Sequence, residues 1–291
     1  MPVGDIYTPL YGELFKLPGG DEIVYAQKVL REYLHNVELP IQAFDSVSDF
    51  KKYGTAISSA IRSVLDDIIH SAVNRSLIFG IKRNIESIKE SGINLNDTDL
   101  MNIQKKYNYN SKFEGKQLST RLYHIERTTH ESLKGIAAIT ELELDAKVRL
   151  ARKYITGEIL GNNTFRPAAI ITVSESRRAI QESGVLVAEY LEETGIQAYC
   201  IWHLSMLPNR KKDVCDSYAQ ISIYKPKDVP KYPHPSCACW VETVTNGDLS
   251  GSGKYNYMAG ALNLLLSGKQ MLGTHNEILD LDQYIEDNEN N

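Results

Sequence analysis

The most regular pattern in the chain is a row of apolar residues at three- and four-residue steps through its first third. This spacing places the side chains on one face of an α-helix, and it predicts an amphipathic helix over residues 55–91 that ends near Gly92. Its members are Ile57, Ile61, Leu65, Ile68, Ala72, Ile81, Ile85 and Ile88. A stripe of this kind is typical of a helix packed in a hydrophobic core.

A second apolar stripe predicts another long helix over residues 116–156, roughly 60 Å in length at 1.5 Å per residue. Its members are Leu118, Leu122, Ile125, Leu133, Ile136, Leu144, Val148 and Ile155. The polar stretch between the two stripes, residues 92–115, is interpreted as a loop. Because two such helices bury their stripes best against each other, we expect a long antiparallel helical hairpin.

The pattern changes after Pro167. The stretch "TVSE", residues 172–175, matches a capping box and predicts a helix start, with Glu175 in the first turn and the helix end at Gly195. The β-branched and aromatic stretch "IQAYCIWHLS", residues 196–205, predicts a buried strand that carries Trp202. Shorter strands are expected in "AQISIY" and "CWVETV".

These elements predict an α+β fold that is mainly α: a long antiparallel helical hairpin, then a small α+β module with a Cys/His-rich hairpin. Prolines are missing between Pro40 and Pro167, and five of the ten fall at or after Pro208. We therefore divide the chain into an extended or helical docking segment (1–50), a long helical domain (51–165), the α+β module (166–250), and a C-terminal helix with an acidic tail (251–291).

Composition adds limits to this picture. The 291 residues are 42% hydrophobic and 24% charged, with a net charge of -5, which is typical of a globular protein and gives no overall attraction to nucleic acid or an anionic membrane. We find no signal-peptide pattern, and no apolar run approaches the roughly 18 residues of a membrane span. The expected place of synthesis and assembly is the cytoplasm, where thiols stay reduced.

The densest chemistry lies in "KYPHPSCACW", residues 231–240, in a chain with four cysteines. Three thiols and an imidazole, from Cys215, His234, Cys237 and Cys239, can close a tetrahedral zinc site, so zinc is a candidate cofactor. The Cys-x-Cys spacing differs from the paired Cys-x2-Cys knuckles of zinc ribbons. The same residues also fit a proline-fixed hairpin, with Pro233 and Pro235 on either side of His234, whose thiols pack as small hydrophobic groups.

Two other interpretations of the cysteines stay open. A disulfide is disfavoured in a reducing compartment. A cysteine nucleophile would need a base and an orienting group, for which His234 and Asp213 are available, but no glycine motif for an oxyanion hole accompanies them.

Several short motifs occur in a fixed order over about residues 165–245. They are "ITVSESRRA", Trp202 in "CIWHLS", "DVCDSYA", "KDVP" and "PHPSCAC". In this order they resemble the minor head proteins, or head morphogenesis proteins, of tailed bacteriophages. Two positions depart from that family: Tyr218 stands where many members have a second cysteine, and Ala238 stands where many have arginine.

The resemblance implies a virion protein rather than an enzyme. Family members bind the portal protein at the portal vertex in few copies and are thought to assist capsid assembly, DNA packaging or DNA ejection, so the major capsid protein and DNA are further candidate partners. The motifs correspond to Cys215, His234, Cys237 and Cys239 as candidate zinc ligands, and to Glu175, Arg177, Trp202 and Asp213 as structural residues. We expect Arg177 to reach carboxylates or carbonyls of the Cys/His-rich segment, and Asp213 to cap a turn or to support a ligand.

A nucleic-acid-binding protein is the alternative. The stretches "NRKKD" (209–213) and "YKPKDVPKY" (224–232) interleave lysine with tyrosine, which suits phosphate contact and base stacking. A hydrolase or a transferase is less supported, because the chain lacks a His-Glu-x-x-His motif and the paired Ser-Thr-Ser and Glu-x-Glu motifs of ADP-ribosyltransferases.

Overall fold

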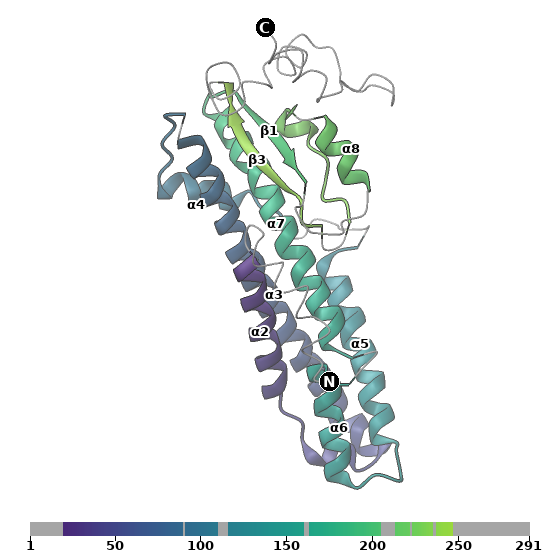
Figure 1. The fold of residues 1–291 in the computed structure, drawn as a ribbon. Coiled ribbons are helices and arrows are strands. Elements are labelled where there is room, and N and C mark those ends of the chain that lie inside the picture. The colour runs from purple at the N-terminus through teal and green to yellow at the C-terminus, as the bar shows by residue number, and fades with distance from the viewer. Residues whose placement is uncertain are drawn as a thin grey trace. The chain divides into compact units, whose positions relative to one another are not determined.

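A computed structural model describes residues 20–89, 91–109, 116–159, 163–204, 213–221, 223–234 and 237–246, with side chains from residue 25 onward (Figure 1). The described chain is mainly helical with one small antiparallel sheet, as the sequence predicted. Several predictions concern residues outside the described ranges. They are the first 19 residues of the predicted docking segment (1–50), the C-terminal helix with its acidic tail (251–291), Pro235, and residues 209–212 of the basic stretch 209–213.

Contacts divide the chain into two compact units. The first unit comprises Met1–Arg75 and Asn108–Ser176, and the second comprises Ser76–Tyr107 and Arg177–Asn291. Two helices, α3 (Val47–Lys89) and α7 (Phe165–Glu193), contribute residues to both units. The four-part division in the sequence analysis was based on composition and turn residues and not on contacts, and it stays a prediction.

The first unit is built from helices. It holds α2 (Gly20–Asn36), the short 3-10 helix η1 (Ile41–Phe44), the first part of α3, α5 (Leu118–Ala137), α6 (Leu144–Thr156) and the start of α7. Ser58 contacts His130, and Arg62 contacts Glu126 at 3.1 Å, so α3 and α5 run antiparallel as predicted. The buried stripe of α3 includes Ile57, Ile61 and Leu65.

The predicted single helix over residues 116–156 was wrong, because the chain ends α5 at Ala137 and begins α6 at Leu144. The segment between them contains neither glycine nor proline, so the sequence carried no breaking residue. The break is stabilised by tertiary contacts. Lys147 of α6 is buried and donates a 3.0 Å hydrogen bond to the Ala137 carbonyl at the end of α5. Helix α6 packs against both α2 and α5.

The second unit holds the α+β part of the chain. It contains the C-terminal parts of α3 and α7, α4 (Asp97–Lys105), α8 (Val214–Gln220) and the 3-10 helix η2 (Pro226–Asp228). Helix α4 lies inside the stretch predicted as a loop, residues 92–115, and that part of the prediction was wrong. Its start is fixed by a capping box in which the Asn96 side chain accepts from Asp99 N and the Asp99 side chain accepts from Asn96 N.

The sheet has the strand order β2-β1-β3, formed by β2 (Ile223–Tyr224), β1 (Ala198–His203) and β3 (Trp240–Thr245). Strand β3 lies across the C-terminal part of α7 (Figure 1), and a Cβ added at Gly184 would come within 2.3 Å of the Val241 carbonyl oxygen. Asn84 of α3 accepts a 2.8 Å hydrogen bond from Thr243 N. Helices α3 and α7 therefore cover the free edge of β3, which protects it from pairing with other strands.

The start predicted for the third helix was also wrong. Helix α7 begins at Phe165, where the Asn163 side chain accepts from Arg166 N, and Pro167 is tolerated in its first turn. Thr172 is therefore inside the helix, and its hydroxyl donates to the Ala168 carbonyl rather than forming a cap. The predicted end was correct, since Gly195 has a φ of 86° and follows the last turn.

Within the described ranges, none of the helices combines the length and the apolar character that crossing a membrane requires.

Candidate metal centre

The second unit brings together three of the four predicted metal ligands. Cys215 Sγ lies 3.6 Å from Cys237 Sγ and 3.4 Å from His234 Nε2. The ligand atoms of these three residues all lie within 4.8 Å of one another, which is close enough for one metal ion to contact all of them. Cys239, the fourth predicted ligand, is buried beside them, and its thiol hydrogen-bonds with those of Cys215 and Cys237. We refer to these four residues as the Cys/His cluster.

Helix α8 places Cys215 in the cluster. Asp213 is the N-cap of this helix: its side chain accepts a 2.8 Å hydrogen bond from Cys215 N, and the Asp216 side chain accepts from Asp213 N. Strand β1 supports the other side of α8, since the buried Trp202 ring contacts Tyr218 edge to face. The predictions that Asp213 caps a turn and that Trp202 lies in a buried strand are confirmed.

Asp213 has a second contact that bears on metal binding. Its Oδ2 lies 3.3 Å from His234 Nε2, the same nitrogen that faces Cys215. A histidine nitrogen that binds a metal offers its lone pair and cannot also donate a hydrogen there. Asp213 and a metal ion therefore compete for one nitrogen, so the carboxylate cannot support His234 through that contact while Nε2 binds metal.

Crowding and burial keep the thiols neutral without a cation. Hydrogen bonds to the Cys237 and Cys239 thiols, together with burial, raise the pKa of Cys215. For Cys237, the hydrogen bond with Cys215 lowers the pKa, but the one with Cys239 and burial outweigh it and raise the pKa to about 12. Thiolates this close repel one another unless a cation lies between them, and a divalent metal would supply that charge.

Helix α7 covers the cluster from the other side through a buried polar face. Gln181 donates a 3.5 Å hydrogen bond to the Pro230 carbonyl, and Arg177, one turn earlier, is 2% exposed. Burial lowers the pKa of Arg177 to about 10, against the opposing effects of the neighbouring Tyr232 and Cys237. The Tyr232 hydroxyl donates a 3.0 Å hydrogen bond to the Cys237 carbonyl. The expected contact of Arg177 with a carboxylate or carbonyl of the Cys/His-rich segment stays a prediction.

Sequence reasoning missed Tyr232 and Gln181 as parts of this site. Tyr232 lies within the quoted motif, and its position two residues before His234 could have suggested a role. Gln181 offered no sign in the sequence, because only the fold brings α7 against residue 230.

Glu175 does not join this site. It lies well inside α7, not in the first turn as predicted, because Asn163 starts the helix earlier. Its carboxylate is buried in the first unit and pairs with Arg121 of α5. Glu175 is therefore one partner of a buried ion pair in the helical unit.

The tyrosines predicted to stack on nucleic-acid bases are not available for stacking. Tyr224 and Tyr232 are both buried, and their hydroxyls donate to the carbonyls of Tyr218 and Cys237. In the described part of the second basic stretch, Lys227 and Lys231 remain exposed. This stretch can contact phosphates through lysine, without the aromatic component of the prediction.

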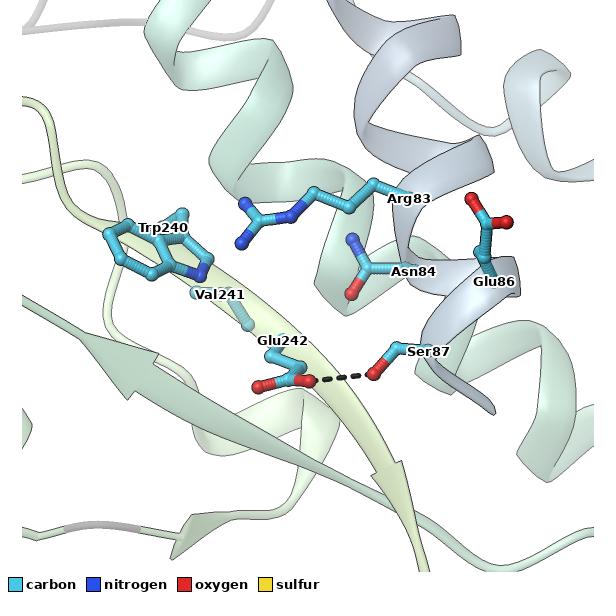
Figure 2. A pocket seen from close by; sticks show the side chains of 7 residues that line it. All are labelled: Arg83, Asn84, Glu86, Ser87, Trp240, Val241 and Glu242. Carbon is cyan, nitrogen blue, oxygen red and sulfur yellow. Dashed lines mark hydrogen bonds between the residues drawn. The ribbon is translucent and has the colours of Figure 1, made fainter. Parts of the chain in front are cut away.

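A second cluster of polar groups in the same unit lines a cavity of about 220 Å³ between α3 and β3 (Figure 2). Arg83 lies over the Trp240 ring at 5.0 Å, and His203 stacks on the same ring. Glu242 accepts a 2.6 Å hydrogen bond from Ser87 and lies 2.7 Å from His203 Nε2. Because the carboxylate stands between the hydroxyl and the imidazole, these residues lack the serine–histidine contact of a nucleophile and its base.

Comparisons with protein-family models, with curated proteins and with solved structures found no match to this chain. The function of the Cys/His cluster must therefore be inferred from its geometry and from the sequence motifs that contain its residues.

Proposed function

We propose that this chain is a minor head protein of a tailed bacteriophage, in which the Cys/His cluster binds a structural zinc ion and the assembled protein associates with the portal vertex. The observation that carries the proposal is convergence. Three motifs of the ordered series meet here: Trp202 of the first contacts Tyr218 of the second, and Cys215 of the second contacts His234 and Cys237 of the third. Residues that share one structural task would be expected to meet in this way.

The spacing of the cluster supports zinc in particular. In a tetrahedral site with Zn–S bonds of about 2.3 Å and Zn–N bonds of about 2.0 Å, two sulfurs lie roughly 3.8 Å apart, and a sulfur and a nitrogen roughly 3.5 Å apart. The corresponding distances here are 3.6 Å for Cys215 to Cys237 and 3.4 Å for Cys215 to His234. Small movements of side chains would suffice to place an ion between these atoms.

A structural role suits this cluster better than catalysis. Cys215, Cys237 and Cys239 are between 1% and 3% exposed, so their sulfurs face protein and not a substrate-sized opening. With His234 the three thiolates fill four positions, which leaves none for a substrate or an activated water. The bound ion would join Cys215 of α8 to His234, Cys237 and Cys239, which follow later in the chain.

The zinc part of the proposal is tested by metal analysis of protein purified without chelator. We expect about one zinc ion per wild-type chain, and loss of zinc together with a lower melting temperature in Cys237→Ser. Cys200→Ser is the matched control, because Cys200 is buried in β1 outside the cluster, and it should keep its zinc. A wild-type chain that holds no zinc, and melts at the same temperature with and without chelator, would leave only a packed hairpin.

The portal part is tested by co-expressing the full chain with the portal protein encoded by the same phage. We expect the two proteins to elute together in size-exclusion chromatography at moderate salt. Separate elution of two folded proteins would argue against the proposal. Retention of the chain on DNA that falls steeply with salt, in the absence of portal binding, would favour the nucleic-acid alternative.

A further inference from the structure

We propose that a groove on the first unit, formed by α5, α6 and the start of α7, is the docking site of this chain's own acidic segment, residues 277–287. The inference goes beyond the proposed function and depends neither on the metal site nor on the portal protein. We refer to this cavity as the α5–α7 groove, and all of its lining residues belong to the first unit. They include Ile125, Tyr154, Pro167, Ile170, Arg166 and His124.

The α5–α7 groove is largely apolar. Ile125 and Tyr154 are 4% and 8% exposed, Pro167 is half-buried, and Ile170 is 47% exposed. The cavity has a volume of about 350 Å³. Because a cavity of roughly 150 Å³ can hold a benzene molecule, the groove has room for about two side chains of that size. Binding of apolar side chains here would remove both surfaces from water, which is favourable.

The charge of the α5–α7 groove is positive. Arg166 is exposed in the first turn of α7, and the exposed His124 of α5 offers a ring N–H donor. The described residues that line the groove include no carboxylate. By contrast, the cavity beside α4 in the second unit carries two lysines together with Glu86 and Asp97. The α5–α7 groove therefore favours an occupant that combines apolar with negatively charged residues.

The sequence "EILDLDQYIED", residues 277–287, has this composition. It contains five acidic residues and no basic one. Ile278, Leu281 and Ile285 follow one another at three- and four-residue steps, the spacing with which an amphipathic helix enters an apolar groove. Residues 1–19 contain only two acidic residues and one lysine, so they match the charge of the groove less well.

The chain between the last described residue and this segment is long enough for docking. Residues 247–276 can span about 100 Å when extended, whereas α3, the longest described helix, measures roughly 65 Å over its 43 residues. A flexible tether of this kind gives an effective concentration on the order of millimolar, so weak binding suffices to fill the groove. An acidic, apolar segment of a partner protein would then bind here only by displacing residues 277–287.

The test places the photoreactive amino acid benzoylphenylalanine at position 170 of the full chain and maps its cross-links by mass spectrometry. We expect cross-links to residues 277–287 of the same chain. A second probe at Thr128, an exposed lining residue on α5, should give the same result. The matched control is a probe at Ile41, which is 41% exposed in the same unit but does not line the groove. It should give about 10-fold fewer cross-links to that segment.

Charge variants test how the segment is recognised. With the probe at position 170, Arg166→Glu should lower the yield of the cross-link about 5-fold or more, because a carboxylate would then repel the acidic segment. Arg149→Glu changes an exposed arginine of α6 outside the groove and should leave the yield unchanged. An equal loss in both variants would overturn the proposal. Serine at the three apolar positions of the segment should also remove the cross-link.

Mixing heavy-isotope-labelled with unlabelled chains identifies the source of the segment. Cross-links that join the two isotopic forms would make a second copy the occupant and overturn the proposal. Cross-links to residues 1–19 instead, or none to residues 277–287 from either probe in the groove, would also overturn it. The zinc content of the same samples reports on the metal site separately, because none of these variants changes the Cys/His cluster.

Discussion

The buried ion pair between Glu175 and Arg121 should be asymmetric in its effect on stability. The Glu175 side chain is 2% exposed, and that of Arg121 is 15% exposed. Replacing Arg121 with Met leaves a carboxylate with almost no access to water, and removal of one partner of a buried pair typically lowers stability by about 3–5 kcal/mol. Glu175→Gln should lower it less, because the Arg121 guanidinium is closer to solvent and an amide can still accept from it.

A double variant tests whether the charge is the cause. Arg121→Met combined with Glu175→Leu removes both charges and should recover most of the loss, since apolar pairs often replace buried ion pairs at little cost in stability. Arg62→Met is the control from the same unit: its pair with Glu126 spans 3.1 Å, but Arg62 is 40% exposed, so the expected loss is below about 1 kcal/mol.

The assay is urea unfolding of the full chain followed by far-ultraviolet circular dichroism. Two results would contradict the expected asymmetry: Arg121→Met loses no more stability than Arg62→Met, or the double variant is less stable than Arg121→Met alone. Either result would mean that the carboxylate is hydrated or neutral in the folded protein.

Four other substitutions have defined expectations. Gly184→Ala should lower the free energy of unfolding by about 1–3 kcal/mol, because the added Cβ would meet the Val241 carbonyl oxygen. At Gly135 an added Cβ meets no atom within 4 Å, so Gly135→Ala should raise the free energy of unfolding by up to about 1 kcal/mol, and thermal melting of both variants checks this. Ile125→Asp places a charge at a 4% exposed position and should cost about 3 kcal/mol or more, so an unchanged urea midpoint would contradict its burial. Asp213→Ala removes the cap of α8 and should cost about 1 kcal/mol, and an unchanged urea midpoint would contradict the capping role.

The parts of the fold that sequence could predict are those in which local pattern and tertiary packing agree. The stripe of α3 predicted the end of that helix within two residues, although the helix begins at Val47 and not at residue 55. The end of α7 followed from Gly195, whose positive φ suits glycine. The break between α5 and α6 could not be predicted. At this break Lys147 donates to the Ala137 carbonyl, a contact that leaves the apolar spacing unchanged.

The site divides in a similar way. Cys215, His234 and Cys237 could be predicted as one group from residue type and order, because thiols and an imidazole are typical zinc ligands. The competing contact of Asp213 with His234 could not, since it depends on a side-chain direction. Thr172 was wrongly predicted to begin a helix. A hydroxyl inside a helix can donate to the carbonyl one turn back, so the sequence "TVSE" is compatible both with a helix start and with a helix interior.

The passage of α3 and α7 through both compact units limits how this protein can be divided by genetic means. The second unit needs residues 76–107 as well as those from 177 onward, so the stretch recognised by its motifs, about 165–245, is not a complete unit. A fragment that begins at residue 165 would lack Asn84, which accepts a hydrogen bond from Thr243 N, and Ser87, which donates one to Glu242. Gene fusions or natural recombination with a single crossover would therefore separate helices that belong to one core. Exchange between related genes should succeed only when the whole span from α3 to β3 moves together.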